Sequence, residues 1–188
     1  MPSPVGHALG ALVAGWAVSG PARWPRAERL RQVAILVAVG VAPDLDLLWG
    51  RHSMETHSIG GAVLVATVAA WQRWPVASTR ARIWMAVAAA WLSHPLLDAL
   101  GADTSVPVGV MAFWPLSSMF YSTELDWFGP ISRRYWLESF WSINLTSIAR
   151  ELVYLTPVTW AVWRLQRVST DKTRGRTFVP GGPLPPSA

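Results

Sequence analysis

Residues 83–100 read IWMAVAAAWLSHPLLDAL, and this stretch decides the fold class of the chain. It contains no Lys, Arg or Glu, and its one acidic residue, Asp98, lies next to the end of the run. A helix that crosses a membrane needs about 20 mainly apolar residues, with a range of roughly 17–25. Residues 33–48 are similar, and shorter apolar stretches occupy residues 7–20, 59–71 and 152–163. Because none of them alternates like a strand, the sequence predicts an all-α, compact, membrane-embedded bundle of about five helices.

Composition narrows the class of protein further. The 188 residues are 52% hydrophobic and only 14% charged, compared with about 25% charged residues in ordinary soluble domains. This excludes a disordered chain, and the lack of cysteine excludes disulfides and thiolate metal sites. The net charge of +5 would suit nucleic acid, but the arginines lie between apolar runs and form no polar face. We therefore expect membrane lipids as partners and no nucleic acid, while the sequence indicates no particular protein partner.

The basic residues predict an orientation in the membrane. Twelve of the sixteen Lys and Arg residues follow the first, third or fifth apolar stretch. The positive-inside rule places these segments in the cytoplasm. Five crossings then predict a multi-pass protein with its C-terminus in the cytoplasm and its N-terminus outside. Nine of the eleven acidic residues and all four histidines fall on the outer side.

Two regions lie outside the predicted spans. Residues 101–150 form a long external loop with four tryptophans, which we expect to contain short helices on the bundle or at the membrane surface. A loop of this length in a compact domain is usually functional. Residues 169–188 are rich in Gly, Pro and Thr, which predicts a disordered cytoplasmic tail. The membrane-embedded domain is therefore expected to comprise residues 1–168.

Histidines and aspartates gather at the outer ends of the predicted helices. His94 and Asp98 are four apart, so in a helix both side chains project from one face. Asp44 and Asp46 would point the same way in an extended segment, since Pro43 disfavours helix at the residue before it. Thr56 or Ser58 can cap the start of the third helix. Four helix ends should thus bring six side chains to one depth: His7, Asp44, Asp46, His57, His94 and Asp98.

This set of side chains is typical of a metal site. Imidazole and carboxylate together suit a divalent ion, with zinc as the first candidate and manganese or iron as alternatives. Each residue alone has an ordinary structural explanation, but ionisable groups near membrane depth cost about 2.5–3.5 kcal/mol or more each. A bound dication would remove that cost for the whole set. The competing interpretation is a proton or ion pathway, which uses the same residue types.

The same residues carry a resemblance to a known family. His7, PDLD at 43–46, THS at 56–58 and HPLLD at 94–98 match its motifs in order. Together with GVMAFWPLS at 109–117, they resemble the YdjM-like family of LexA-binding, inner-membrane-associated metal-dependent hydrolases. The resemblance covers roughly residues 4–118.

The resemblance implies a particular kind of metal centre. The family is distantly similar to zinc-dependent phospholipases C and single-strand nucleases, which are all-helical enzymes with clustered zinc. By that similarity one or two zinc ions are expected, and Asp98 would bridge them if there are two. His7 would bind one ion, while His57, His94 and either Asp44 or Asp46 would bind the other.

Two departures from these patterns define the accessory candidates. The family's hairpin has an Arg after its first histidine, whereas residues 52–58 here read HSMETHS, so Arg51 is the candidate to replace it. His52 is explained equally well as an interfacial residue. The phospholipases also have a second His-x-x-x-Glu pair, of which only Glu151, four residues after Ser147, would remain here.

We therefore expect an integral membrane metal-dependent hydrolase that acts on phosphoesters, including lipids. A metal-activated water would attack, and Asp44 or Asp46 would act as the general base. Two other classes stay open. A non-enzymatic membrane protein with a structural metal predicts a closed coordination shell. A small ion or proton transporter predicts polar residues throughout the membrane depth, and the apolar inner halves of the helices argue against it.

Overall fold

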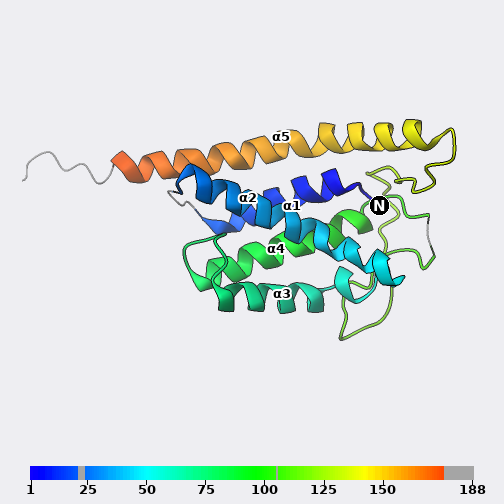
Figure 1. The fold of residues 1–188 in the computed structure, drawn as a ribbon, viewed down its shortest axis with the longest axis horizontal. Helices are drawn as coiled ribbons and strands as arrows, with labels where there is room; N and C mark the ends of the chain where they lie inside the picture. The colour runs from blue at the N-terminus through cyan, green and yellow to red at the C-terminus, as the bar shows by residue number, and fades with distance from the viewer. Residues whose placement is uncertain (21–23, 105, 176–188) are drawn as a thin grey trace, which may run out of the picture.

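The computed structural model describes residues 1–20, 24–104 and 106–175 (Figure 1). Within them the protein is all-helical, as predicted, with two isolated β-bridges and no strand. The five α-helices are α1 (Pro4–Ser19), α2 (Arg26–Val41), α3 (Ile59–Gln72), α4 (Arg80–Ala99) and α5 (Phe140–Gly175). Two 3-10 helices, η1 (Ala42–Trp49) and η2 (Glu55–His57), lie between α2 and α3.

Small polar side chains fix where the helices begin. Ser3 caps α1 and accepts hydrogen bonds from the amides of Val5 and Gly6, with Pro4 in the first helical position. Ser58 caps α3, as the sequence suggested, and Thr79 caps α4. Each cap satisfies an amide that the helix itself leaves unpaired.

The end of α2 differs from the prediction. Asp44 and Asp46 lie in the 3-10 helix η1 and not in an extended segment. Pro43 cannot donate to the α-helical ladder, but the start of a new helix does not need its missing N–H. The chain therefore changes from α to 3-10 geometry at Ala42, and η1 ends at Gly50, whose φ of 70° is left-handed.

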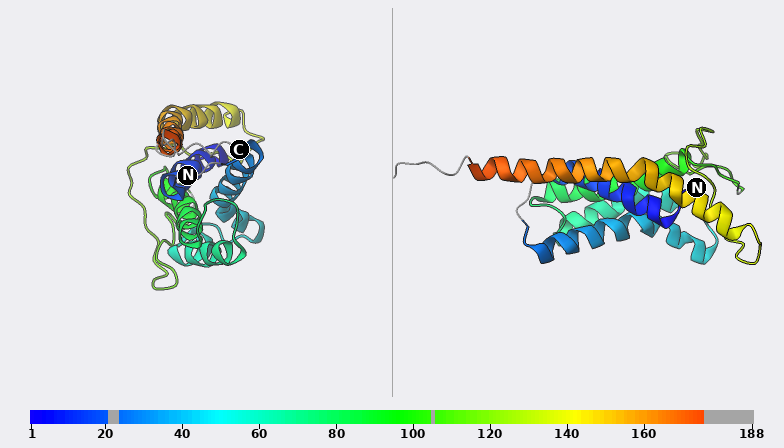
Figure 2. Two further views of the ribbon diagram at one scale, coloured as in Figure 1. Left: turned by 90° about the vertical axis from the view of Figure 1, so that its left-hand side faces the viewer. Right: turned by 90° about the horizontal axis from the view of Figure 1, so that it is seen from above.

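Helix α1 lies at the centre of the bundle. It packs against α2, α4 and α5, while α3 packs on α4, and Figure 2 shows α5 running along one side of the molecule. Small side chains such as Ala11, Ala66 and Ala86 are fully buried and allow the helices to approach closely. Helices α1 and α2 are close at Gly40, where an added Cβ would lie 2.3 Å from Cβ of Ala11.

One segment is long and apolar enough to cross a membrane. It is Arg26–Trp49, 24 residues with a mean hydropathy of 1.6, which combines α2 and η1. Helices α1 and α3 are apolar but have only 16 and 14 residues, in keeping with the short first and third stretches of the sequence. By length and composition, one of the described helical segments could cross a membrane, whereas the sequence predicted five crossings.

The loop between α4 and α5, predicted to be external, is shorter than predicted and has another structure. Its described residues between α4 and α5 form turns and two bridges, Gly101 with Phe128 and Val110 with Tyr121, and no short helix. Backbone hydrogen bonds tie it to the start of α3, where Ile59 donates to Ala112. In this loop, backbone hydrogen bonds to other segments are formed where short helices were expected.

Helix α5 extends in both directions beyond the apolar stretch at residues 152–163. It starts at residue 140, so the loop ends before residue 150, and it continues to Gly175, beyond the predicted tail boundary at residue 169. The rest of the predicted tail, residues 176–188, lies outside the described residues.

The close crossing of α1 and α2 gives a first prediction. Gly40→Ala would place a methyl group 2.3 Å from Ala11 and 2.9 Å from the carbonyl oxygen of His7. Separating the two helices should destabilise the protein by about 1–3 kcal/mol, measured by thermal unfolding in detergent. The control is Ala34→Val, which adds volume on an exposed part of α2. A Gly40→Ala protein as stable as the parent would contradict the packing described.

Candidate metal centre

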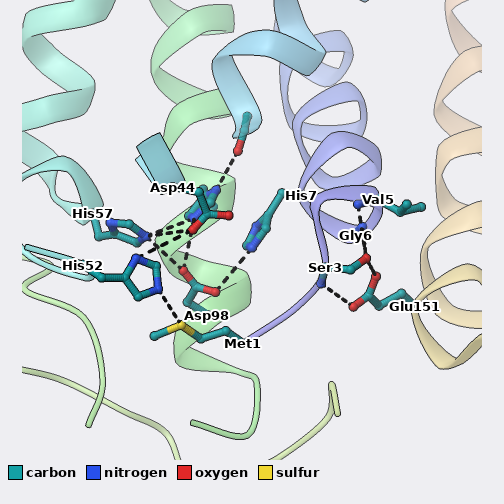
Figure 3. Close-up of polar contacts among 12 residues, drawn as sticks. Met1, Ser3, Val5, Gly6, His7, Asp44, His52, His57, Asp98 and Glu151 are labelled. Atoms are coloured by element: carbon teal, nitrogen blue, oxygen red, sulfur yellow. Dashed lines mark hydrogen bonds and ion pairs between the residues drawn. The ribbon is translucent and has the colours of Figure 1, made fainter. Parts of the chain in front are cut away.

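All six predicted ligands come together at one end of the bundle, and His52 joins them. Figure 3 labels His7, Asp44, His52, His57 and Asp98 of this cluster. His7 comes from the first helix, and His94 and Asp98 from α4. Asp44 and Asp46 come from η1, and His57 from η2. Five of the six are almost completely buried, whereas the Asp44 side chain is 24% exposed. The alternation of helix directions thus brings the side chains to one depth, as expected.

Four ligand atoms form a tight cluster. His57 Nε2 and His94 Nε2 are 3.1 Å apart, and Asp98 Oδ2 lies 3.4 Å from the first and 3.2 Å from the second. Asp44 Oδ1 lies 3.8 Å from His57 Nε2 and 3.5 Å from His94 Nε2. Zinc binds histidine nitrogen and carboxylate oxygen at about 2.0–2.2 Å, so tetrahedral ligands are separated by about 3.3–3.5 Å. The donor types and their spacing therefore fit a zinc-sized ion.

The hydrogen bonds of the two imidazoles fix which nitrogen carries the proton. His94 Nδ1 lies 2.6 Å from the carbonyl oxygen of Gly40, which can only accept. His57 Nδ1 lies 3.1 Å from Asp46 Oδ2 and 3.0 Å from the hydroxyl of Thr56. Both Nδ1 atoms are therefore donors, and in the neutral rings both Nε2 lone pairs face each other. Such a pair needs a proton or a cation between or beside the two nitrogens.

Asp46 holds other members of the site in place. Its Oδ1 lies 2.9 Å from His52 Nδ1, and its Oδ2 accepts a hydrogen bond of 2.6 Å from Thr56. With His57 Nδ1 as a third partner, both carboxylate oxygens are engaged. A carboxylate on the far nitrogen of a ligand histidine is the usual support of a metal site. Thr56 was missed as a member, although its position beside His57 was a signal.

His7 extends the cluster on the other side of Asp98. Its ring stacks on that of His94, with 3.6 Å between the ring centroids, and its Nε2 lies 3.4 Å from Asp98 Oδ1. Its Nδ1 is buried and has no hydrogen-bond partner among the described residues. Asp98 thus points one oxygen at His7 and the other at His57 and His94.

The charge of the site is strongly negative when its histidines are neutral. It combines the carboxylates of Asp44, Asp46 and Asp98, which form ion pairs only with histidines among the described residues. Burial lowers the pKa of His57, but the neighbouring carboxylates of Asp44 and Asp46 outweigh it, so this pKa lies above its ordinary value. Positive charge is therefore favoured at this position, whether as protons or as a metal ion.

Two accessory candidates lie outside the cluster. Arg51 forms an exposed ion pair with Glu55. Glu151 of α5 is fully buried but accepts a hydrogen bond of 2.6 Å from the amide of Ser3 and another from its hydroxyl. Figure 3 shows this pair separated from the histidines by the start of α1. Glu151 therefore anchors α5 to the first turn of α1, one turn before His7.

The anchoring role of Glu151 gives a second prediction. Glu151→Ala would leave the buried amide and hydroxyl of Ser3 without their acceptor, which should destabilise the protein by about 1–3 kcal/mol. Glu151→Gln keeps one acceptor oxygen and should cost less, which thermal unfolding in detergent can measure. Metal content of the folded protein should stay at the parent level in both variants. An equal stability of Glu151→Ala and the parent would contradict this role.

The support by Asp46 gives a third prediction. Asp46→Asn keeps the size of the side chain but removes the charge that orients His52 and His57. Loss of such an outer-shell partner typically lowers metal affinity by about 10–100-fold, which competition with a chromophoric chelator would measure. The matched control is Glu55→Gln, which removes a nearby carboxylate that pairs with Arg51. Equal affinities of Asp46→Asn and the control would argue against the support role.

Comparison with known proteins identifies the family of this chain. No curated protein and no solved structure matches it. The family model described as YdjM inner membrane protein matches residues 1–176, which includes all the residues of the cluster. This match covers most of the sequence and agrees with the resemblance of the motifs. The chain therefore belongs to the YdjM inner membrane protein family.

Proposed function

We propose that the protein is a membrane-bound metal-dependent hydrolase that acts on phosphoesters. The observation that carries this proposal is the pair of Nε2 atoms of His57 and His94, 3.1 Å apart, with both Nδ1 atoms already donating. Together with Asp98 Oδ2 they form a triangle of ligand atoms with sides of 3.1, 3.2 and 3.4 Å. These three residues would hold one divalent ion, with zinc as the best match to the donor set.

Asp44 is the proposed general base. Its Oδ1 is farther from the histidine nitrogens, at 3.5 and 3.8 Å, and it is the one carboxylate of the cluster with appreciable exposure. Asp46 is less suited to this role because its oxygens are engaged by His52, Thr56 and His57. Asp44 could therefore accept a proton from an attacking water on the open side of the ligand triangle.

A divalent ion at this position would lower the pKa of a coordinated water towards about 7 and polarise a phosphoryl oxygen. Asp98, with its second oxygen facing His7, would keep the His7 ring against His94. Asp46 and the Gly40 carbonyl would orient the two ligand imidazoles. Catalytic zinc sites typically have three protein ligands and one open position for water or substrate.

The substrate class follows from the membrane setting. A protein of an inner membrane family with its candidate site at one end of the bundle is suited to substrates at the headgroup level. We propose a multi-pass arrangement with this end on the extracytoplasmic side, since Arg-rich segments lie at the other end. A lipid phosphoester would meet the site there.

The second candidate function is a structural metal site, and Asp44 is the observation that favours it. If Asp44 Oδ1 is a fourth ligand, the shell is closed and no position remains for a substrate. The two functions predict different effects of removing the Asp44 charge. Loss of a general base would lower turnover, whereas loss of a ligand would lower metal binding.

The test combines metal analysis with hydrolysis assays, and it gives a fourth prediction. Purified protein in detergent should contain one equivalent of metal and cleave phosphodiester or phosphomonoester substrates. His94→Ala and Asp98→Ala should lose the metal and the activity. Asp44→Asn should keep the metal and lose roughly 100–10,000-fold in turnover, as expected for a general base.

The control is again Glu55→Gln, an exposed carboxylate near the site, which should keep both metal and activity. Loss of metal in Asp44→Asn, without turnover in the parent, would favour the structural function. Metal-free parent protein, or unchanged turnover in His94→Ala, would reject the hydrolase. Metal-dependent ion flux in proteoliposomes without hydrolysis would identify the transporter instead.

A further inference from the structure

A second site lies at the opposite end of the bundle from the histidine cluster. A cavity of about 570 Å³ opens between the end of α1, the start of α2 and the C-terminal part of α5, on the left in Figure 1. Its volume is in the range of about 300–1,000 Å³ that is typical of small-molecule sites. Three tryptophans form apolar walls, Trp16, Trp24 and Trp163.

The polar part of the lining is cationic. Arg26, Arg29 and Arg167 line the cavity, and no Asp or Glu is among its described lining residues. The nearest acidic residue in sequence, Glu28, pairs with Arg31, which does not line the cavity. Guanidinium groups that have no acidic residue among the described lining of their cavity attract anions, and their planar forks match phosphate oxygens.

Two of these arginines are held in place. Arg29 donates to the carbonyl oxygen of Trp24 over 3.2 Å, and the guanidinium of Arg167 lies over the ring of Trp163, 3.9 Å from its centroid. Stacking leaves the edge of a guanidinium free to donate in its own plane. A ligand therefore need not immobilise these two side chains, which lowers the entropic cost of binding.

The wall of the cavity also contains a residue with an unpaired donor, Trp24. The indole Nε1 of Trp24 is buried and has no hydrogen-bond partner among the described residues. Buried donors are almost always paired, and an orphan one needs an explanation. The start of α2 adds to this, because its N-cap residue, Pro25, provides no side-chain hydrogen bond to the first amides.

We propose that this cavity binds a phosphate-bearing anion, with the phosphate at Arg29 and Arg167 and its apolar part against the tryptophans. The indole of Trp24 contributes one of these apolar walls. The volume exceeds what a phosphate alone needs, and the aromatic walls favour an amphiphile. An anionic phospholipid headgroup and a soluble organic phosphate share this chemistry. The site is separate from the histidine cluster and does not depend on its proposed function.

The test measures binding to the full chain, purified in a non-ionic detergent. Dioctanoyl phosphatidylglycerol, dioctanoyl phosphatidylcholine and inorganic phosphate are compared by native mass spectrometry and equilibrium dialysis. Phosphatidylglycerol should bind more tightly than phosphatidylcholine. The Arg29→Gln/Arg167→Gln variant should weaken this binding at least about tenfold, because charge-assisted hydrogen bonds are lost. Arg31→Gln, on the same helix but outside the cavity, is the matched control and should bind like the parent.

Arg29→Gln alone leaves Arg167 stacked on Trp163, and it should weaken binding severalfold. This variant still tests the site if the double variant does not fold. Comparable binding of inorganic phosphate would support the site with a soluble anion as its occupant, whereas binding of the lipid alone would support a headgroup. Equal binding of the two lipids, or parent-like binding by Arg29→Gln and the double variant, would overturn the proposal. Metal content should be unchanged in every variant, which separates this test from that of the hydrolase.

Discussion

The two imidazole nitrogens that face each other across 3.1 Å impose the strongest constraint on this structure. Each ring is held from behind, His94 by the Gly40 carbonyl and His57 by Asp46. Neither ring can turn its other nitrogen inwards without breaking a buried hydrogen bond, which typically costs about 1–3 kcal/mol for the group left unpaired. The facing lone pairs therefore require positive charge, and the carboxylate of Asp98 beside them favours that charge, whether it is a proton or a metal ion.

The bundle around this pair is arranged to keep it in place. The Gly40 carbonyl reaches His94 in the region where α1 and α2 cross closely, and a methyl group at residue 40 would collide with Ala11. The 3-10 turn that follows Pro43 brings Asp44 and Asp46 to different partners in the same cluster. The buried pair of Glu151 and Ser3 anchors the first turn of α1, and His7 follows on the next turn. Packing, backbone geometry and the hydrogen bonds that orient the imidazoles thus all act on one end of the molecule.

The two ends of the bundle are chemically opposite. One end gathers the carboxylates of Asp44, Asp46 and Asp98 around histidines, whereas the other gathers arginines and tryptophans around a cavity. Apolar helices separate the two, and buried alanines such as Ala66 and Ala86 fill the space between them. In a membrane this division would place a cation site and an anion site at different surfaces. The net charge of +5 is the sum of these two unlike ends.

The sequence by itself determined the helical class and six members of the histidine cluster. Apolar runs of this length without alternation are typical of helices, and the spacing of His94 and Asp98 needs nothing beyond one helical turn. The tertiary structure alone decided which atoms face each other and which carboxylate is engaged. The distinction between Asp44 and Asp46 depends on a 3-10 turn and on Thr56, and the location of Glu151 depends on how α5 packs against α1. Local patterns record which side of an element a residue occupies, whereas contacts between distant segments depend on the packing of the whole bundle.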